Sequence, residues 1–264
     1  MNRPVLPSPA STLASGRFAP VLLVIAHGSR DPRHAATVQA LVRRAGALRP
    51  GLRVETAFLD FNLPSVAGVL DRLAAEGVRD VVALPLLLTR AFHAKADIPA
   101  VLRGAPAGLR IRQAEVLGPS PLLLAAVERR LYEAGLTPGD QSTTGVVLAS
   151  AGSTDPEAIA AIAETARELR RTGWCSVRPA FASASLPRTE DAVRALRAEA
   201  GVRRVAVAPY VIAPGRLPDR IAAGAAEADV LAGVLGPSPE LARLLVLRYT
   251  DALRVRERPA VAAG

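Results

Sequence analysis

The hydrophobic residues of the first half of the chain fall into short continuous runs instead of alternating with polar residues. Runs of this length are typical of parallel strands that helices cover on both faces. Four runs predict strands, at 20–26, 53–58, 79–87 and 111–116. Since longer, more polar segments separate these runs, the first half predicts four strands alternating with four helices.

Two of the intervening segments carry signals for the start of a helix. Asp31 precedes Pro32, and Ser120 precedes Pro121. A carboxylate or hydroxyl at such a position accepts a hydrogen bond from a free backbone N–H group, and proline fits the first helical residue. We therefore predict helices that begin at Pro32 and at Pro121.

The second half of the chain repeats these landmarks in the same order. Ala-His-Gly-Ser-Arg-Asp-Pro at 26–32 corresponds to Ser-Ala-Gly-Ser-Thr-Asp-Pro at 150–156, 124 positions later, and Leu-Gly-Pro-Ser-Pro is found at both 117–121 and 235–239. A repeat of this length argues for two similar domains and against a solenoid. The predicted fold is α/β, with two tandem domains, each a parallel four-stranded sheet with helices on both faces, and an active cleft between them.

The repeat also predicts the domain boundaries. The polar stretch 137–144 is the expected join, so we place the first domain at 20–136 and its repeat at 144–256. Residues 1–19 are rich in Pro, Ser and Ala and lack the apolar segment of a signal peptide. We interpret them as a disordered leader.

Composition narrows the class of protein. No run approaches the roughly 18 uninterrupted apolar residues of a membrane-spanning helix, and a single cysteine, Cys175, excludes an internal disulfide. A cytoplasmic location is the default expectation, with no membrane partner. The formal net charge is +9, almost all of it from arginine, because Lys95 is the only lysine.

Two interpretations of this positive charge remain. The arginines are spread along the predicted helices, and aromatic residues make up only 3% of the chain, which does not favour nucleic acid. Either the arginines form a solvated surface, or they attract a polyanionic small molecule.

The residues with candidate chemistry lie at the strand ends of the first half. Ligands of open parallel sheets bind beyond the carboxyl ends of the strands. His27 follows the first predicted strand, Asp60 the second, and His93 the third after a short loop. The repeat places neutral residues at the corresponding positions: Ala151, Ser183 and Leu217. The two imidazoles and the acid are therefore confined to one copy, although an imidazole bonded to nearby backbone is the alternative for His27.

This donor set predicts a metal site and argues against other chemistries. Two imidazoles and one carboxylate suit Fe²⁺, Co²⁺ or Ni²⁺ and leave coordination positions open, unlike a structural zinc site. A histidine phosphatase needs arginine before the histidine, where this chain has Ala26, and neither an ATP loop nor a dinucleotide fingerprint is present. We interpret the third histidine, His34, as an exposed surface residue on the first helix.

Three motifs in this order resemble those of the sirohydrochlorin chelatases, ATP-independent class II chelatases that insert cobalt or iron. They are Ala-His-Gly-Ser-Arg-Asp-Pro at 26–32, Ala-Phe-Leu-Asp-Phe-Asn-Leu-Pro-Ser at 57–65, and Phe-His-Ala-Lys-Ala-Asp-Ile-Pro at 92–99. The resemblance covers nearly the whole chain and matches the long, duplicated form of the family. It implies insertion of Fe²⁺ or Co²⁺ into sirohydrochlorin, for sirohaem or cobalamin, with no cofactor beyond that metal ion. A non-catalytic tetrapyrrole or metal carrier is the alternative.

The resemblance also implies roles for individual residues. His27 and His93 match the family's two metal-handling histidines, and Asp60 stands where the family usually has glutamate, which leaves open whether it binds metal or accepts protons. For the carboxylates of the macrocycle, the polar residues nearest the histidines in sequence are the candidates: Ser29, Arg30, Arg33, Arg90 and Lys95. A duplication of this kind can replace a symmetric dimer of half-length chains, so we expect a monomer.

Overall fold

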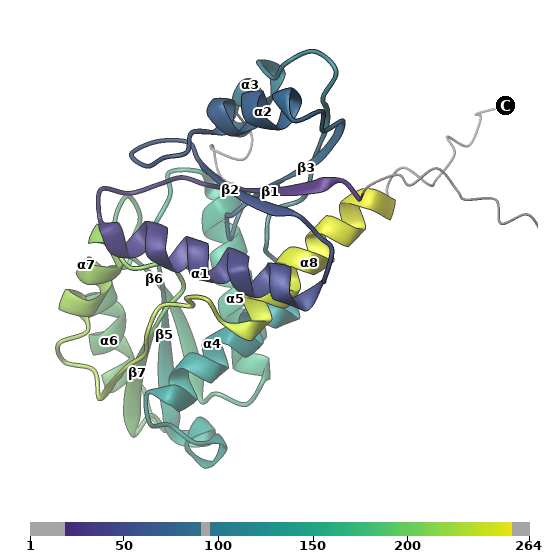
Figure 1. Cartoon of the computed structure of the whole chain (residues 1–264). Coiled ribbons are helices and arrows are strands. Elements are labelled where there is room, and N and C mark those ends of the chain that lie inside the picture. The colour runs from purple at the N-terminus through teal and green to yellow at the C-terminus, as the bar shows by residue number, and fades with distance from the viewer. Residues whose placement is uncertain (1–18, 91–95, 255–264) are drawn as a thin grey trace, which may run out of the picture.

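The computed structural model describes residues 19–90 and 96–254. All but the last residue of the predicted leader lies outside the described residues, and so do His93 and Lys95. The described chain forms two parallel sheets of four strands each, with helices packed around them (Figure 1). The prediction of an α/β fold with two parallel four-stranded sheets is confirmed.

The two sheets have the same topology. The strands of the first sheet are arranged in the order β2-β1-β3-β4, and those of the second in the order β6-β5-β7-β8. The strands of the first sheet are β1 (Val21–Ala26), β2 (Val54–Phe58), β3 (Asp80–Pro85) and β4 (Arg110–Gln113). Those of the second are β5 (Thr144–Ser150), β6 (Ser176–Phe181), β7 (Arg204–Pro209) and β8 (Val230–Leu231). The inner strands of each sheet, β1 and β3 in the first and β5 and β7 in the second, pair with a strand on both sides.

The helices begin where the capping residues indicate. The Asp31 carboxylate accepts a hydrogen bond from the backbone N–H of Arg33 at 2.9 Å, and the Ser120 hydroxyl accepts one from Leu122 at 3.3 Å, so both predicted starts are confirmed. The first half contains α1 (Pro32–Leu48), α2 (Val66–Ala75), α3 (Ile98–Arg103) and α4 (Pro121–Glu133). After the 3-10 helix η2 (Pro138–Thr143), the second half contains α5 (Pro156–Arg171), α6 (Thr189–Arg197), α7 (Arg216–Gly224) and α8 (Pro239–Arg254).

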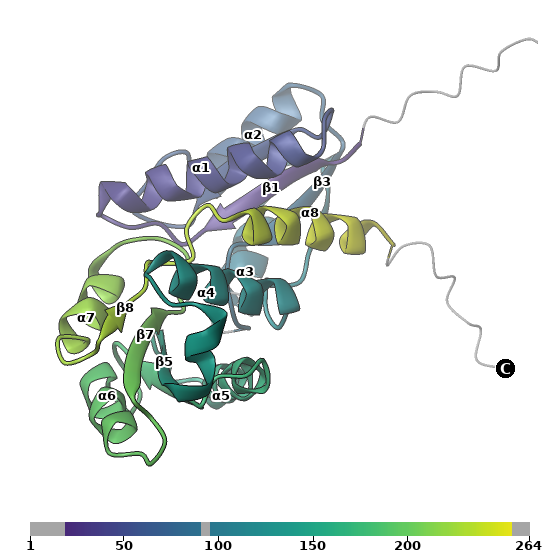
Figure 2. The same ribbon diagram turned by 90° about the horizontal axis from the view of Figure 1, so that it is seen from below.

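Successive side chains of each strand enter different layers of the molecule. In β1, Leu23 packs in an outer cluster with α2 and α3, while Leu22 packs in a central cluster. Val147 of β5 likewise belongs to an outer cluster with α6 and α7, and Val146 to the same central cluster as Leu22. The central cluster therefore joins both halves, with α1, α4, α5 and α8 between the two sheets (Figures 1 and 2).

The last helices of the two halves are exchanged. Helix α4 of the first half contacts β7 and α5, whereas α8 of the second half packs against α1 and contacts β3 (Figure 2). Arg129 of α4 forms an ion pair with the buried Glu240 of α8 at 2.6 Å, and the Tyr249 hydroxyl donates to the Pro20 carbonyl at 2.8 Å. The predicted division at 137–144 follows the repeat in sequence and stays a prediction. None of the described helices combines the length and apolarity needed to span a membrane.

Candidate functional site

His27 lies in a tight turn directly after β1, and the backbone around it builds that turn. Gly28 has φ +99°, and a Cβ atom there would lie 1.9 Å from the carbonyl oxygen of Asp60. The turn therefore requires glycine at this position. The Asp60 backbone N–H donates to the His27 carbonyl at 2.9 Å, which ties the end of β1 to the end of β2.

The second half contains the same turn without an imidazole. Gly152 has φ +98°, and its added Cβ would lie 1.9 Å from the Ser183 carbonyl oxygen. The Ser183 backbone N–H donates to the Ala151 carbonyl at 3.0 Å, as Asp60 does to His27. This turn forms with either alanine or histidine before the glycine, so the imidazole of His27 is not needed to make it.

A cavity of about 390 Å³ lies between the two halves, at the carboxyl ends of their strands. Each half contributes its first strand end, one face of its first helix and the segment after its third strand. The first half provides Ala26, His27, Gly28, Ser29, His34, Val38 and the segment 86–89. The second provides Ser150, Ala151, Gly152, Ser153, Ala158, Ile159, Ile162, Phe181 and the segment 210–218. The predicted cleft between the halves is therefore present in the structure.

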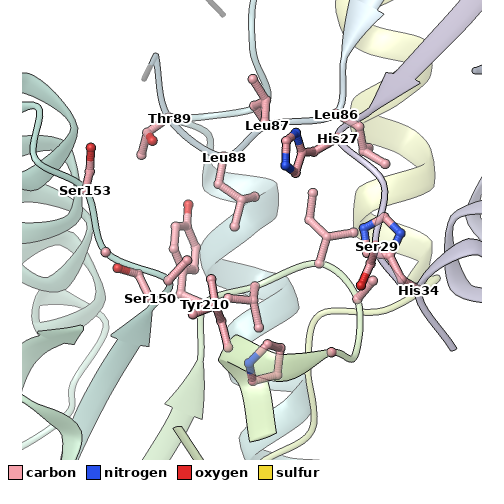
Figure 3. Close-up of a pocket in the computed structure, with 18 of the residues that line it drawn as sticks. His27, Ser29, His34, Leu86, Leu87, Leu88, Thr89, Ser150, Ser153 and Tyr210 are labelled. Atoms are coloured by element: carbon pink, nitrogen blue, oxygen red, sulfur yellow. The ribbon is translucent and has the colours of Figure 1, made fainter. Parts of the chain in front are cut away.

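The walls of this cavity are mostly apolar. Leu88 and Ile212 stand at equivalent places of the two halves, after β3 and β7. Figure 3 shows the imidazoles of His27 and His34 on one side of the cavity, with Ser150, Ser153 and Tyr210 on the other. Burial raises the pKa of Tyr210 far above its usual value, so its hydroxyl stays protonated. A cavity of this size with a few polar groups among apolar walls is typical of a small-molecule site.

His34 was interpreted from the sequence as an exposed surface residue, and this interpretation is wrong. The side chain is half-buried and lines the cavity from α1, one turn before Val38. Burial, and then the nearby His27, lower the pKa of His34 below its ordinary value, whereas Asp31 acts in the opposite direction. The sequence contained a signal for this position, because His34 stands one turn before Val38 on the buried face of α1.

Two of the predicted metal-handling residues, His27 and Asp60, lie in different surroundings. His27 is half-buried and lines the cavity, and its ring lies edge-on to Phe61 with the ring centroids 6.1 Å apart. Asp60 is exposed on the next loop and is not among the residues that line the cavity; its Oδ1 accepts from the Phe61 backbone N–H at 2.8 Å. Within residues 19–90 and 96–254, no three His, Cys, Asp or Glu side chains are grouped so that they could hold a metal ion. A metal site formed by His27, His93 and Asp60 therefore stays a prediction.

Two of the candidate residues for substrate binding lie beside the cavity on the first half. Ser29 lines it, and its hydroxyl also accepts from the Asp31 backbone N–H at 3.1 Å, a bond that Ser153 and Asp155 repeat in the second half. Arg30 is exposed, and its guanidinium lies 5.1 Å from the centroid of the Phe61 ring. Arg30 is thus a positive charge held near His27 by an aromatic neighbour.

Arg33 connects the two halves. Its guanidinium pairs with Asp31 at 2.5 Å and with Asp219 of α7 at 2.7 Å, and these carboxylates raise its pKa further. The halves also approach each other at Gly215, where an added Cβ would lie 3.7 Å from the Ser29 hydroxyl oxygen. Ser29 and Gly215 both line the cavity, so the two halves meet at its edge.

Two more arginines bear on substrate binding: Arg90, which was predicted from the sequence, and Arg216, which was not. They lie on opposite halves. Arg90 is exposed and lines a separate cavity of about 190 Å³, with its guanidinium 3.8 Å from Glu115. Arg216, at the start of α7, lines the main cavity and was not among the candidates. The repeat contained a signal for it, because Leu217 is the counterpart of His93 and Arg216 is its neighbour.

The fold and the cavity define a class: duplicated α/β proteins with a ligand-sized cavity at the facing carboxyl edges of their two sheets. The CbiX family model matches residues 21–134 and again residues 145–252. The chain therefore belongs to the CbiX family and contains two copies of its domain. This result confirms the resemblance inferred from the three motifs.

Known relatives agree with this assignment. The chain is 28% identical over 254 residues to a sirohydrochlorin cobaltochelatase of Priestia megaterium, covering 90% of this chain and 81% of that protein. It is 27% identical over 206 residues to a sirohydrochlorin ferrochelatase of Bacillus subtilis, covering 76% and 77%. The solved structure of SirB from Bacillus subtilis with Fe³⁺ has the same fold, with a TM-score of 0.77, 23% identity and coverage of 90% and 96%. These names do not favour a carrier or a histidine phosphatase.

Proposed function

We propose that this chain is an ATP-independent chelatase that inserts Fe²⁺ or Co²⁺ into sirohydrochlorin, in the synthesis of sirohaem or cobalamin. The observation that carries the proposal is the cavity between the halves, with the half-buried His27 at the carboxyl end of β1. The named activities of the relatives in Priestia megaterium and Bacillus subtilis supply the substrate.

The cavity suits a flat ring that carries many carboxylates. Apolar side chains from both halves can pack on the two faces of the macrocycle, whereas its carboxylates must stay near water or meet positive charge. Arg30 and Arg33 are exposed beside the cavity, and Arg216 lines it. In this proposal these three arginines bind the carboxylates of the macrocycle. Ser29, Arg90 and Lys95 are further candidates from the sequence.

Metal insertion requires a weakly held ion, a bound macrocycle and an acceptor for the two pyrrole protons. In this proposal the neutral imidazoles of His27 and His93 hold the ion through nitrogen lone pairs. Asp60 balances the charge or receives a proton, and the structure leaves its carboxylate free to reach solvent on the loop after β2. The second half has no imidazole at these positions and supplies the facing wall.

The test uses the purified full chain with sirohydrochlorin and either metal ion under anaerobic conditions, followed by the absorbance change on insertion. We expect a rate above that of the uncatalysed reaction, and a loss of at least about 100-fold for His27→Ala or His93→Ala. Ala151→Gly is the matched control, because it alters the same turn in the second half, and it should retain activity. Unchanged rates in both histidine variants would contradict the assignment.

The same assay separates a chelatase from a carrier. A carrier binds the macrocycle but never exceeds the uncatalysed rate at any protein concentration. Competition between Fe²⁺ and Co²⁺ in one reaction measures which ion the chain prefers.

We also propose that the protein acts as a monomer in the cytoplasm, without nucleic acid or membrane partners. The central hydrophobic cluster already joins two copies of the domain within one chain, which supports the monomer. Light scattering during size-exclusion chromatography tests it, and a mass of twice the 27.5 kDa of the chain would contradict it.

A further inference from the structure

His34 is an imidazole inside the cavity that the mechanism above does not use. It is half-buried on α1 and lies on the same side of the cavity as His27 (Figure 3). An imidazole that faces a ligand cavity and has no structural partner in the protein is available to hydrogen-bond a ligand there.

The contacts do not indicate a structural role for the ring. Its Nδ1 is buried and has no hydrogen-bond partner in the described part of the chain. Its aromatic neighbour is Phe58, at 6.4 Å between ring centroids in a tilted arrangement, and an apolar side chain would serve equally well there. Burying a polar nitrogen without a partner is unfavourable, so packing alone does not account for a histidine at this position.

The duplication shows that the fold does not need an imidazole here. The position of His34 in α1 corresponds to Ala158 in α5, and Ala158 also lines the cavity. One turn later, Val38 corresponds to Ile162, and both line the cavity as well. The two helices thus face the cavity with equivalent positions, and only the first half has an imidazole, as with His27 and Ala151.

The surroundings of His34 favour the neutral form of the imidazole, which can accept a hydrogen bond. Burial, and then the nearby His27, lower the pKa of His34 below its ordinary value, and Asp31 acts in the opposite direction. A neutral imidazole has one N–H donor and one free lone pair. The cavity around it is otherwise mainly apolar, so its best ligand partner is a donor away from the charged periphery of the ligand.

We propose that His34 accepts a hydrogen bond, through Nε2, from a pyrrole N–H group of the metal-free macrocycle, and thereby favours substrate over product in the cavity; the buried Nδ1 lies out of reach of a ligand. The proposal rests on the proposed function. The pyrrole N–H groups are the donors at the centre of the ring, and they are lost when the metal replaces their protons. The bond to His34 therefore exists with the substrate and disappears with the product, which weakens product binding relative to substrate.

The test compares the affinities of the full chain for metal-free sirohydrochlorin and for its cobalt complex, both by absorbance titration. For His34→Leu we expect about a tenfold loss of affinity for the metal-free ring, the order expected for one hydrogen bond. Affinity for the cobalt complex should stay within about twofold. His34→Gln places an amide oxygen near the position of Nε2 and should restore binding of the metal-free ring.

Ile159→Ala is the matched control, because Ile159 lines the same cavity from α5 without a polar group. It should weaken both forms of the macrocycle alike. The proposal is overturned if His34→Leu binds the metal-free ring as tightly as the unaltered protein, weakens both forms alike, or weakens the cobalt complex more. The last outcome would make His34 an axial ligand of the inserted metal. If the unaltered protein binds neither form, the proposed function fails instead.

Discussion

The two walls of the cavity are built from the same backbone and differ in the side chains that bear chemistry. Gly28 and Gly152 occupy turns with nearly identical φ values and the same close approach to the neighbouring loop. At the adjacent position the first half has His27 and the second Ala151. The comparison separates two requirements: the glycine is needed to form the turn in both halves, whereas the turn forms without the imidazole, to which we assign the proposed chemistry of the first half.

The largest effect on stability is expected from substituting the glycine that both halves have in this turn. Gly28→Ala and Gly152→Ala each place a Cβ 1.9 Å from a carbonyl oxygen, at a positive φ that disfavours any side chain. Each should lower the free energy of unfolding by roughly 3 kcal/mol or more, by clash and backbone strain together. Chemical denaturation measures this. A variant with an unchanged midpoint would show that the loop after β2 or β6 can move away.

The next largest effect is expected from moving the imidazole, which only the first half has in this turn. Moving the imidazole to the other wall, as in His27→Ala combined with Ala151→His, should leave the rate of metal insertion about 100-fold below that of the unaltered protein, or about 2.7 kcal/mol in activation free energy. The expected reason is that Asp60 and His93 belong to the first copy and remain there. Recovery of activity in the double variant would show that the two walls are interchangeable.

The sequence was sufficient for features that depend on local pattern or on the repeat. Continuous apolar runs indicated the inner strands β1 and β3, and Asp31 and Ser120 marked helix starts that the structure contains. The prediction that His34 is exposed was wrong because it overlooked the helical spacing that places His34 on the same face of α1 as the buried Val38. The helix exchange was out of reach of the sequence, because the apolar face of α8 shows that the helix is buried but does not show against which sheet.

A smaller effect is expected where the halves meet through the exchanged helices. Hydrogen bonding from Arg129 lowers the pKa of the buried Glu240. Because the unfolded chain binds this proton more readily, the stabilisation is present above the unfolded pKa, about 4.3, and is lost as the pH falls through the lower folded value.

Glu240→Gln should therefore lower the thermal midpoint at pH 7 by about 2–4 °C. The difference from the unaltered protein should shrink as the pH is lowered from 6 to 3. Calorimetry at several pH values measures this, and Glu133→Gln, an exposed acid on α4, serves as the control. A difference that stays constant with pH would exclude the ion pair as its cause.

The smallest effect on stability is expected at the exposed contact between Arg33 and Asp219. An exposed ion pair contributes little to folding, so Asp219→Asn should leave the thermal midpoint within about 1 °C. It should nevertheless tighten binding of the anionic macrocycle two- to threefold at low salt, because one carboxylate no longer competes for Arg33, and the gain should fade at high salt. Weaker binding would instead indicate that the contact must stay closed.

The exchange of α4 and α8 has a consequence for the order in which the protein can be completed during its synthesis. The first sheet and α1 are translated early, yet α8, which packs against α1 and contacts β3, comes after the whole second sheet. When the first half has been translated, part of one apolar face of its sheet is therefore still uncovered. Domains usually fold one after another as they emerge, but here the early half must wait for the last helix to leave the exit tunnel.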